Sequence, residues 1–262
     1  MTFWDHLDEL RKSLTYPVIV LLLLTVVAFS LKEPLFDMVL AANSRNFITY
    51  QIMPGGSGEG TSETLVQLIN TELPAQLLIH MKVSFYVALV LTIPYLFFKL
   101  FRFATPALYE NERKYSGRIL TFSFLSFFAG LLVNYFVIFP FSLRFLVSYQ
   151  VSEQVPNFIS ITSYINMLMT LSILMGVCFE LPVVSWILSL FGVLKASMLR
   201  QYRRHAFVGI LILAAIITPT TDIFTLLLVS LPIVLLYELS ILISWSTEKG
   251  RKKRMDLEES SV

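Results

Sequence analysis

The sequence predicts an all-α, polytopic membrane protein with six transmembrane helices, and three observations support this fold class. Hydrophobic residues make up 56% of the chain and charged residues only 15%, with a mean hydropathy of +0.72, which excludes a soluble domain. The charged residues stand mostly between long apolar runs rather than within them. A helix satisfies its own backbone hydrogen bonds in lipid, and the alternating pattern of barrel strands is absent.

Six apolar segments are delimited by the points at which the charged residues stop. The fifth has 13 residues, about 20 Å of helix, whereas the hydrocarbon core is about 30 Å thick. The sixth soon meets Glu238. We therefore expect short fifth and sixth helices that could thin the bilayer, although a re-entrant turn at residues 218–222 explains the short fifth segment equally well. The six segments are residues 14–31, 73–98, 119–143, 163–190, 206–218 and 223–246.

Lysine and arginine residues predict the orientation and the domain organisation. With six spans, sixteen of the twenty basic residues fall on the side of both termini, so the positive-inside rule predicts cytoplasmic termini. Residues 1–247 are expected to form one transmembrane domain. Residues 248–262 are expected to form a charged, disordered cytoplasmic tail whose cations attach to anionic lipid. The outer loop, 32–72, contains a flexible glycine-rich turn at 54–60 between short amphipathic pieces.

Two further expectations concern processing and redox chemistry. A cleavable signal peptide is not expected, because the first span follows acidic residues and lacks a small-residue cleavage site, and no transit peptide is expected before Met1. The single cysteine, Cys178, lies within an apolar span. It therefore excludes a disulfide framework and is expected to be a small buried hydrophobic side chain.

Charged residues inside the spans need a physical reason, because each costs of order 3 kcal/mol at the bilayer centre. Glu180 lies in the fourth span beside Pro182, which frees a backbone carbonyl one turn earlier. Glu180 is either part of a buried interhelical hydrogen bond or a polar contact for a substrate or partner segment. Lys82 is expected to snorkel, His80 to face the surface, and Glu238 to pair with a loop cation.

Four motifs together resemble the TatC family, whose members are the core subunit of the twin-arginine protein translocase. They occur in the family's order and cover nearly the whole chain. The sequence departs from the family pattern at Thr221, where many members have proline, and at Leu226 and Lys99, where glutamine is common. The four motifs are HLDELR at 6–11, FATPALYENER at 103–113, FELP at 179–182, and TPTTD at 218–222 followed by Leu231-Pro232.

The resemblance implies a receptor for signal peptides that carry two adjacent arginines. Each guanidinium is best answered by a carboxylate in bidentate geometry, which lysine cannot reproduce, so two separate acids are needed. By the family match these acids are Glu9 and Glu112, with Arg11 and Phe103 shaping the same site. Considered singly, Glu9 could instead be a solvated helix acid, and Glu112 an exposed loop acid balanced by the neighbouring cations.

The resemblance also implies partners and a location. The expected partners are twin-arginine signal peptides of folded cargo, TatA-type and TatB-type single-span subunits, further TatC copies and membrane lipid, with no nucleic acid and no cofactor. Glu180 is expected to meet a partner subunit or the inserted signal peptide, and Asp222 to cap the sixth helix or to have a functional role. The implied location is the cytoplasmic (inner) membrane of a bacterium, with the proton motive force as the energy source.

Other functions fit the sequence less well, and no enzyme is expected. The GGSG sequence at 55–58 matches the short serine motif of rhomboid proteases, yet it lies in a flexible loop with no histidine on a neighbouring span as its base. No phosphate-binding glycine loop is present, and three scattered histidines with one cysteine do not form a metal site. A small-solute transporter would show an internal repeat, which is not found. A membrane scaffold would not need the cytoplasmic acids.

Overall fold

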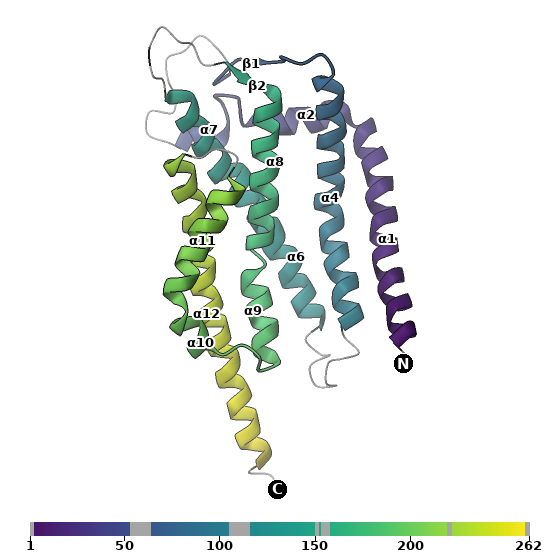
Figure 1. Cartoon of the computed structure of the whole chain (residues 1–262), viewed down its shortest axis with the longest axis vertical. Coiled ribbons are helices and arrows are strands. Elements are labelled where there is room, and N and C mark those ends of the chain that lie inside the picture. Colours follow the sequence, from purple (N-terminus) through teal and green to yellow (C-terminus); the bar gives the residue numbers. More distant parts are fainter. Residues whose placement is uncertain are drawn as a thin grey trace. The chain divides into compact units, whose positions relative to one another are not determined.

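The protein is described by a computed structural model, shown in Figure 1, that covers residues 3–52, 64–104, 116–149, 152, 158–218 and 222–259. The described residues are almost entirely helical, with one pair of two-residue strands. In chain order the elements are α1 (Phe3–Ser30), α2 (Lys32–Ala41), α3 (Ile48–Ile52), β1 (Leu68–Ile69), α4 (Ala75–Ala104), α6 (Ser116–Val133), the π-helix η2 (Asn134–Ile138), α7 (Phe139–Ser148), β2 (Ile159–Ser160), α8 (Ile161–Cys178), α9 (Leu181–Leu190), α10 (Ala196–Gln201), α11 (Arg203–Ile217) and α12 (Ile223–Glu259).

The polytopic, all-helical fold class is confirmed. Within the described residues, four helical segments are long and apolar enough to cross a membrane: Ala75–Phe97, Ile119–Ser148, Ile161–Leu190 and Ile223–Gly250. A fifth is obtained if Thr15–Ser30 and Lys32–Ala41, which are bent by 87° relative to each other, count as one span. The helix α11 has only 15 residues, so the fifth segment is as short as predicted. The total of six spans and the location of the termini stay predictions.

Two expectations for the end of the chain are wrong. The sixth helix is not short, because α12 runs for 37 residues from Ile223. Glu238 does not end it, since its carboxylate forms an ion pair with Arg203 at 2.5 Å. Residues 248–259 continue the same helix instead of a disordered tail. These residues are rich in lysine, arginine and glutamate, which favour helix.

The chain forms two compact units where the sequence predicts one domain. The first unit contains residues 1–108 and 131–173, and the second contains residues 109–130 and 174–262. The helices α6 and α8 are therefore each divided between the units. The reason lies in the chain path, because each unit is assembled from segments that are distant in the sequence.

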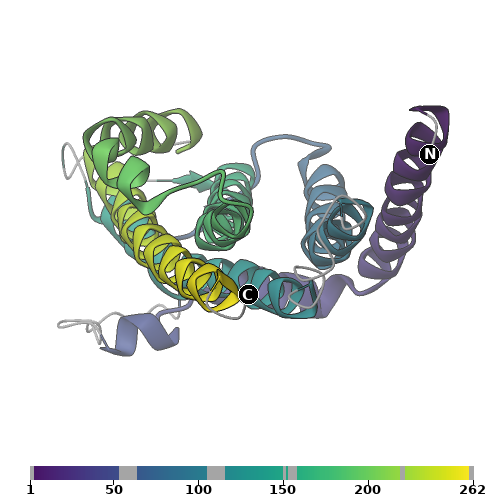
Figure 2. The same ribbon diagram turned by 90° about the horizontal axis from the view of Figure 1, so that it is seen from below.

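In the first unit, α1 and α4 run side by side in opposite directions (Figures 1 and 2). At the end of the pair where α1 meets α2, the bend between these two helices packs on His80. The imidazole stacks on Phe29 with ring centroids 4.0 Å apart and meets Phe36 edge-on at 5.8 Å. His80 is 9% exposed, so the expectation of a surface-facing imidazole is wrong. Its aromatic neighbours come from both sides of the bend.

Buried hydrogen bonds lie within the described part of residues 32–72 and join it to α8. Tyr50 is 1% exposed, and its hydroxyl donates to the carbonyl of Ala42 at 2.9 Å. Burial raises the pKa of this phenol far above its usual value. The hydroxyl of Tyr164, from α8, donates to the carbonyl of Val39 at 2.9 Å. Residues 54–60, the predicted flexible turn, lie outside the described residues.

In the second unit, two glycines let α6 approach the carboxyl end of α8 closely. A Cβ added at Gly130 would lie 2.5 Å from the carbonyl oxygen of Met175. A Cβ added at Gly176 would lie 2.6 Å from the ring of Phe127. Small residues at such a contact allow helix backbones to pack without a side chain between them, as is common in membranes. In the same unit α12 packs along both α9 and α11.

We predict that Gly130→Ala lowers the unfolding free energy by about 1–3 kcal/mol, because its methyl group would meet backbone, which cannot rotate away. Gly176→Ala should cost less, since the Phe127 ring can shift. The measurement is the thermal unfolding midpoint of the purified protein in detergent. Gly209→Ala in α11 is the matched control, because nothing lies within 4 Å of its added Cβ. An unchanged midpoint for Gly130→Ala would disprove the close contact.

Candidate functional site

The HLDELR motif lies in α1, and the first two residues of the FATPALYENER motif, Phe103 and Ala104, end α4. Glu9 and Arg11 belong to the first three turns of α1, and Phe103 belongs to the last turn of α4. Because the two helices are antiparallel, the amino end of α1 and the carboxyl end of α4 lie at the same end of the pair (Figure 1). The HLDELR segment and Phe103, the first residue of FATPALYENER, thus belong to helix ends on the same side of the pair, and residues 105–113 lie outside the described residues.

Arg11 is exposed, and its backbone carbonyl accepts a hydrogen bond from the Thr15 hydroxyl at 2.7 Å. Glu112 lies outside the described residues, as do the side chains of Glu9 and Phe103. Their arrangement around a ligand therefore stays a prediction. What the structure supplies is the common end of the two helices that carry three of the four positions.

A contact that the sequence alone does not reveal joins the two helices near this end. The Lys99 ammonium lies 5.1 Å from the ring centroid of Tyr16, on α1, and 5.4 Å from that of Tyr95, on α4. Each cation–π contact is worth about 0.5–1 kcal/mol at a partly exposed site. The spacing of Tyr95 and Lys99, four residues apart on a helix, is a signal that could have suggested half of this arrangement. Lys99 thus positions the carboxyl end of α4 against α1.

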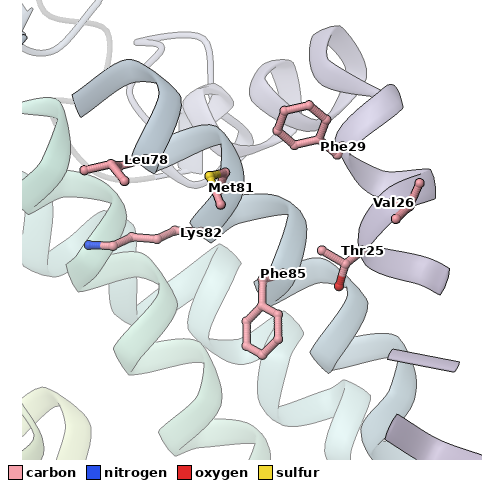
Figure 3. A pocket seen from close by; sticks show the side chains of 7 residues that line it. All are labelled: Thr25, Val26, Phe29, Leu78, Met81, Lys82 and Phe85. Atoms are coloured by element: carbon pink, nitrogen blue, oxygen red, sulfur yellow. The ribbon is translucent and has the colours of Figure 1, made fainter. Parts of the chain in front are cut away.

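Further along the same helix pair there is a cavity of about 580 Å³ (Figure 3). Thr25, Val26 and Phe29 of α1 line one side of it. Met81 and Phe85 are among the residues of α4 that line the other side. Lys82 also belongs to the lining, but Figure 3 shows its ammonium extending away from the α1 side chains. The surface between the two helices is therefore apolar and suits an apolar segment.

Glu180 lies in the second unit, at the break between α8 and α9. It is 7% exposed, and both of its carboxylate oxygens are 2.9 Å from the Ser123 hydroxyl of α6. The Ser126 hydroxyl, one turn further along α6, donates to the carbonyl of Phe179. Pro182 is the second residue of α9 and has no backbone N–H to donate. The structure thus shows the buried interhelical hydrogen bond, and a contact with a partner stays a prediction.

Next to this break a cavity of about 540 Å³ is formed by α6, α9 and α12. Phe179 and Pro182 from the break line it, together with Trp186 of α9 and Leu239 of α12. Ser126 is a polar residue in this otherwise apolar wall. The cavity therefore places apolar surface beside the Glu180 region.

Three other predicted residues have clear structural roles. The Asp222 carboxylate accepts a hydrogen bond from the backbone N–H of Thr225 at 2.6 Å, which caps the amino end of α12, and a functional role for Asp222 stays a prediction. Glu238 pairs with Arg203, as predicted. Cys178 is free and buried, as predicted. Within the described ranges, no group of three histidine, cysteine, aspartate or glutamate residues could hold a metal ion.

The comparisons with known proteins agree with these motifs. The family model described as Sec-independent protein translocase protein (TatC) matches residues 5–232. A "Sec-independent protein translocase protein TatC" of Blattabacterium sp. subsp. Periplaneta americana is 31% identical over 96% of this chain and 97% of its own length. The protein of the same name from Deinococcus radiodurans is 33% identical over 92% of this chain and 84% of its own length.

Solved structures give the same result. A "Crystal Structure of Twin Arginine Translocase Receptor- TatC" superposes with a TM-score of 0.75 at 29% identity, covering 91% of this chain and 97% of the other. A second crystal structure of that receptor, in the detergent DDM, gives a TM-score of 0.76 at 28% identity, covering 91% and 99%. The family match spans most of the chain, and the fold match covers nearly all of both chains. This chain therefore belongs to the TatC family of Sec-independent protein translocase proteins.

Proposed function

We propose that this chain is the signal-peptide receptor and core component of a twin-arginine translocase, which exports folded proteins across the cytoplasmic membrane of a bacterium. The observation that carries the proposal is the common end of α1 and α4, where the HLDELR segment and the start of the FATPALYENER segment lie. Family membership supports a transport role rather than catalysis. The sixteen basic residues on one side support cytoplasmic termini and cytoplasmic recognition.

Recognition of the arginine pair rests on charge and shape. Glu9 and Glu112 would each accept hydrogen bonds from one guanidinium, with Arg11 and Phe103 bordering the site. A planar guanidinium offers two parallel donors to a carboxylate, whereas a lysine ammonium offers a point charge without this fork. The geometry would therefore favour arginine over lysine at both positions. The cation–π contacts of Lys99 support this role by fixing α4 against α1 near the site.

The apolar stretch that follows the arginines needs an apolar surface. The cavity between α1 and α4 provides one, since its wall is built from Val26, Phe29, Met81 and Phe85 among others. A peptide anchored by its arginines at the end of the α1–α4 pair could extend along these helices toward that cavity. Burial of apolar surface would then add to the charge recognition.

Glu180 is proposed to act later, as a polar contact for a partner subunit or the inserted signal peptide. The hydrogen bond to Ser123 fixes the position of the Glu180 carboxylate within the membrane-spanning segment. Among the described residues, no basic side chain forms an ion pair with it. A polar group from a partner could share or replace that hydrogen bond. The proposed partners are TatA-type and TatB-type single-span subunits and further copies of this chain, with transport driven by the proton motive force.

Glu9 and Glu112 are proposed to bind the arginine pair directly. Replacing Glu9 or Glu112 by Gln should weaken binding of a twin-arginine signal peptide at least about fivefold, because each variant removes roughly 1 kcal/mol of charge-assisted hydrogen bonding. The measurement is fluorescence anisotropy of a labelled peptide with the full chain in lipid nanodiscs. Glu33→Gln is the control, since Glu33 is an exposed acid in the first turn of α2, at the other end of α1. Equal affinity of all three variants would remove these acids from the site.

Glu180 is proposed to contact a partner or the inserted signal peptide. Glu180→Ala should preserve folding and signal-peptide binding but reduce co-purification of partner subunits or export of a folded reporter. Ser123→Ala removes the hydroxyl that contacts both carboxylate oxygens and leaves the acid, so it separates the internal hydrogen bond from the partner contact. Normal assembly and export in Glu180→Ala would refute the partner contact. Equal losses of assembly or export in Glu180→Ala and Ser123→Ala would indicate that Glu180 acts only through its hydrogen bond to Ser123.

A further inference from the structure

A third cavity, of about 440 Å³, lies between the amino end of α11 and the middle of α12. Arg203 and Arg204 form its polar rim. The side chains of Phe207, Val208 and Val234 form much of its apolar wall. None of the residues proposed for signal-peptide recognition or for the Glu180 contact lines this cavity, so it is a separate feature of the second unit.

The charges at the rim leave an excess of one positive charge. Arg203 pairs with Glu238 at 2.5 Å, so these two side chains neutralise each other. Arg204 is exposed and, within the described residues, has no hydrogen bond or ion pair. Arg203 retains further donors, because a guanidinium carries five N–H groups. The rim can therefore accept an anion at Arg204 without breaking the existing ion pair.

The surroundings of the cavity indicate which kind of molecule reaches it. Val208 is 53% exposed, and Ile212 and Ile216, further along α11, are also strongly exposed and apolar. In a helix of a membrane protein, such a face meets lipid. The charged rim lies at the end of α11 that the positive-inside rule places on the cytoplasmic side, where anionic lipids are found. On this basis we expect phospholipid headgroups near the two arginines.

We propose that this cavity is a binding site for an anionic phospholipid, with the phosphate on Arg204 and Arg203 and one acyl chain in the groove between α11 and α12. The planar guanidinium matches phosphate oxygens in bidentate geometry. From Arg203 to Ile210 the lining spans eight residues of helix, about 10 Å from the first Cα to the last, which accommodates the first part of an acyl chain. Basic pockets between transmembrane helices on the cytoplasmic side typically bind anionic headgroups.

Native mass spectrometry of the purified full chain tests the site by titration with phosphatidylglycerol and, separately, phosphatidylcholine. We expect tighter binding of phosphatidylglycerol, and Arg204→Gln should weaken it about fivefold, which corresponds to about 1 kcal/mol. Arg200→Gln is the matched control, because it removes the same charge from the exposed surface of α10, outside the cavity, and should change the affinity less than about twofold. Equal losses in both variants, or equal affinity for the two lipids, would overturn the proposal.

Three further measurements distinguish a lipid site from a simple anion site and from a protein-docking site. Val208→Trp fills the apolar groove without changing the charge, so it should also weaken phosphatidylglycerol binding, and full retention would contradict the acyl-chain contact. Inorganic phosphate should compete poorly, whereas competition at equal concentration would indicate a simple anion site. Finally, a photoreactive residue at Phe207 in native membranes should form lipid adducts. Adducts to an acidic segment of another protein instead would overturn the proposal.

Discussion

The hydrogen bonds between α6 and the break from α8 to α9 are the constraint on which the second unit depends. In lipid, a broken helix leaves backbone groups that water cannot satisfy, so neighbouring side chains must do so. Ser126 donates to the Phe179 carbonyl, and Ser123 contacts both oxygens of Glu180. Two serines on one face of α6 therefore supply hydrogen bonds to the residues at the break. The close approach at Gly130 brings α6 to the distance that these short serine side chains can bridge.

This constraint explains how a carboxylate can be kept inside a membrane helix. Ser123 and Glu180 are both buried, and together they form a polar point in an apolar unit. In the first unit, by contrast, Glu9, Arg11 and Phe103 belong to helix ends, where a charged residue costs less than at the bilayer centre. The α1–α4 pair therefore combines a charged end with an apolar surface further along, which is the arrangement that an arginine-led apolar signal peptide requires.

The sequence predicted the fold class, the short α11, the ion pair of Glu238 and the buried Cys178, because each follows from local composition or from the cost of burying charge. Sequence-based prediction failed where contacts between segments distant in the sequence determine the structure. His80 is buried because the bend after Ser30 brings Phe29 and Phe36 against it, and no periodicity encodes that bend. The long α12 was missed because its charge at Glu238 is neutralised by Arg203 from another helix. The cation–π contact of Lys99 was likewise missed, because its partner Tyr16 lies far away in the sequence.

Crosslinking a signal peptide to the unaltered chain tests the receptor function most directly. The peptide would carry a photoreactive residue beside its arginine pair, and mass spectrometry would map the crosslinks on the membrane-embedded protein. We predict crosslinks to the first turns of α1 and the last turn of α4, and their loss when both peptide arginines are changed to lysine. Equal labelling by the two peptides, or labelling confined to the α1–α2 bend, would contradict recognition of the arginine pair at this end.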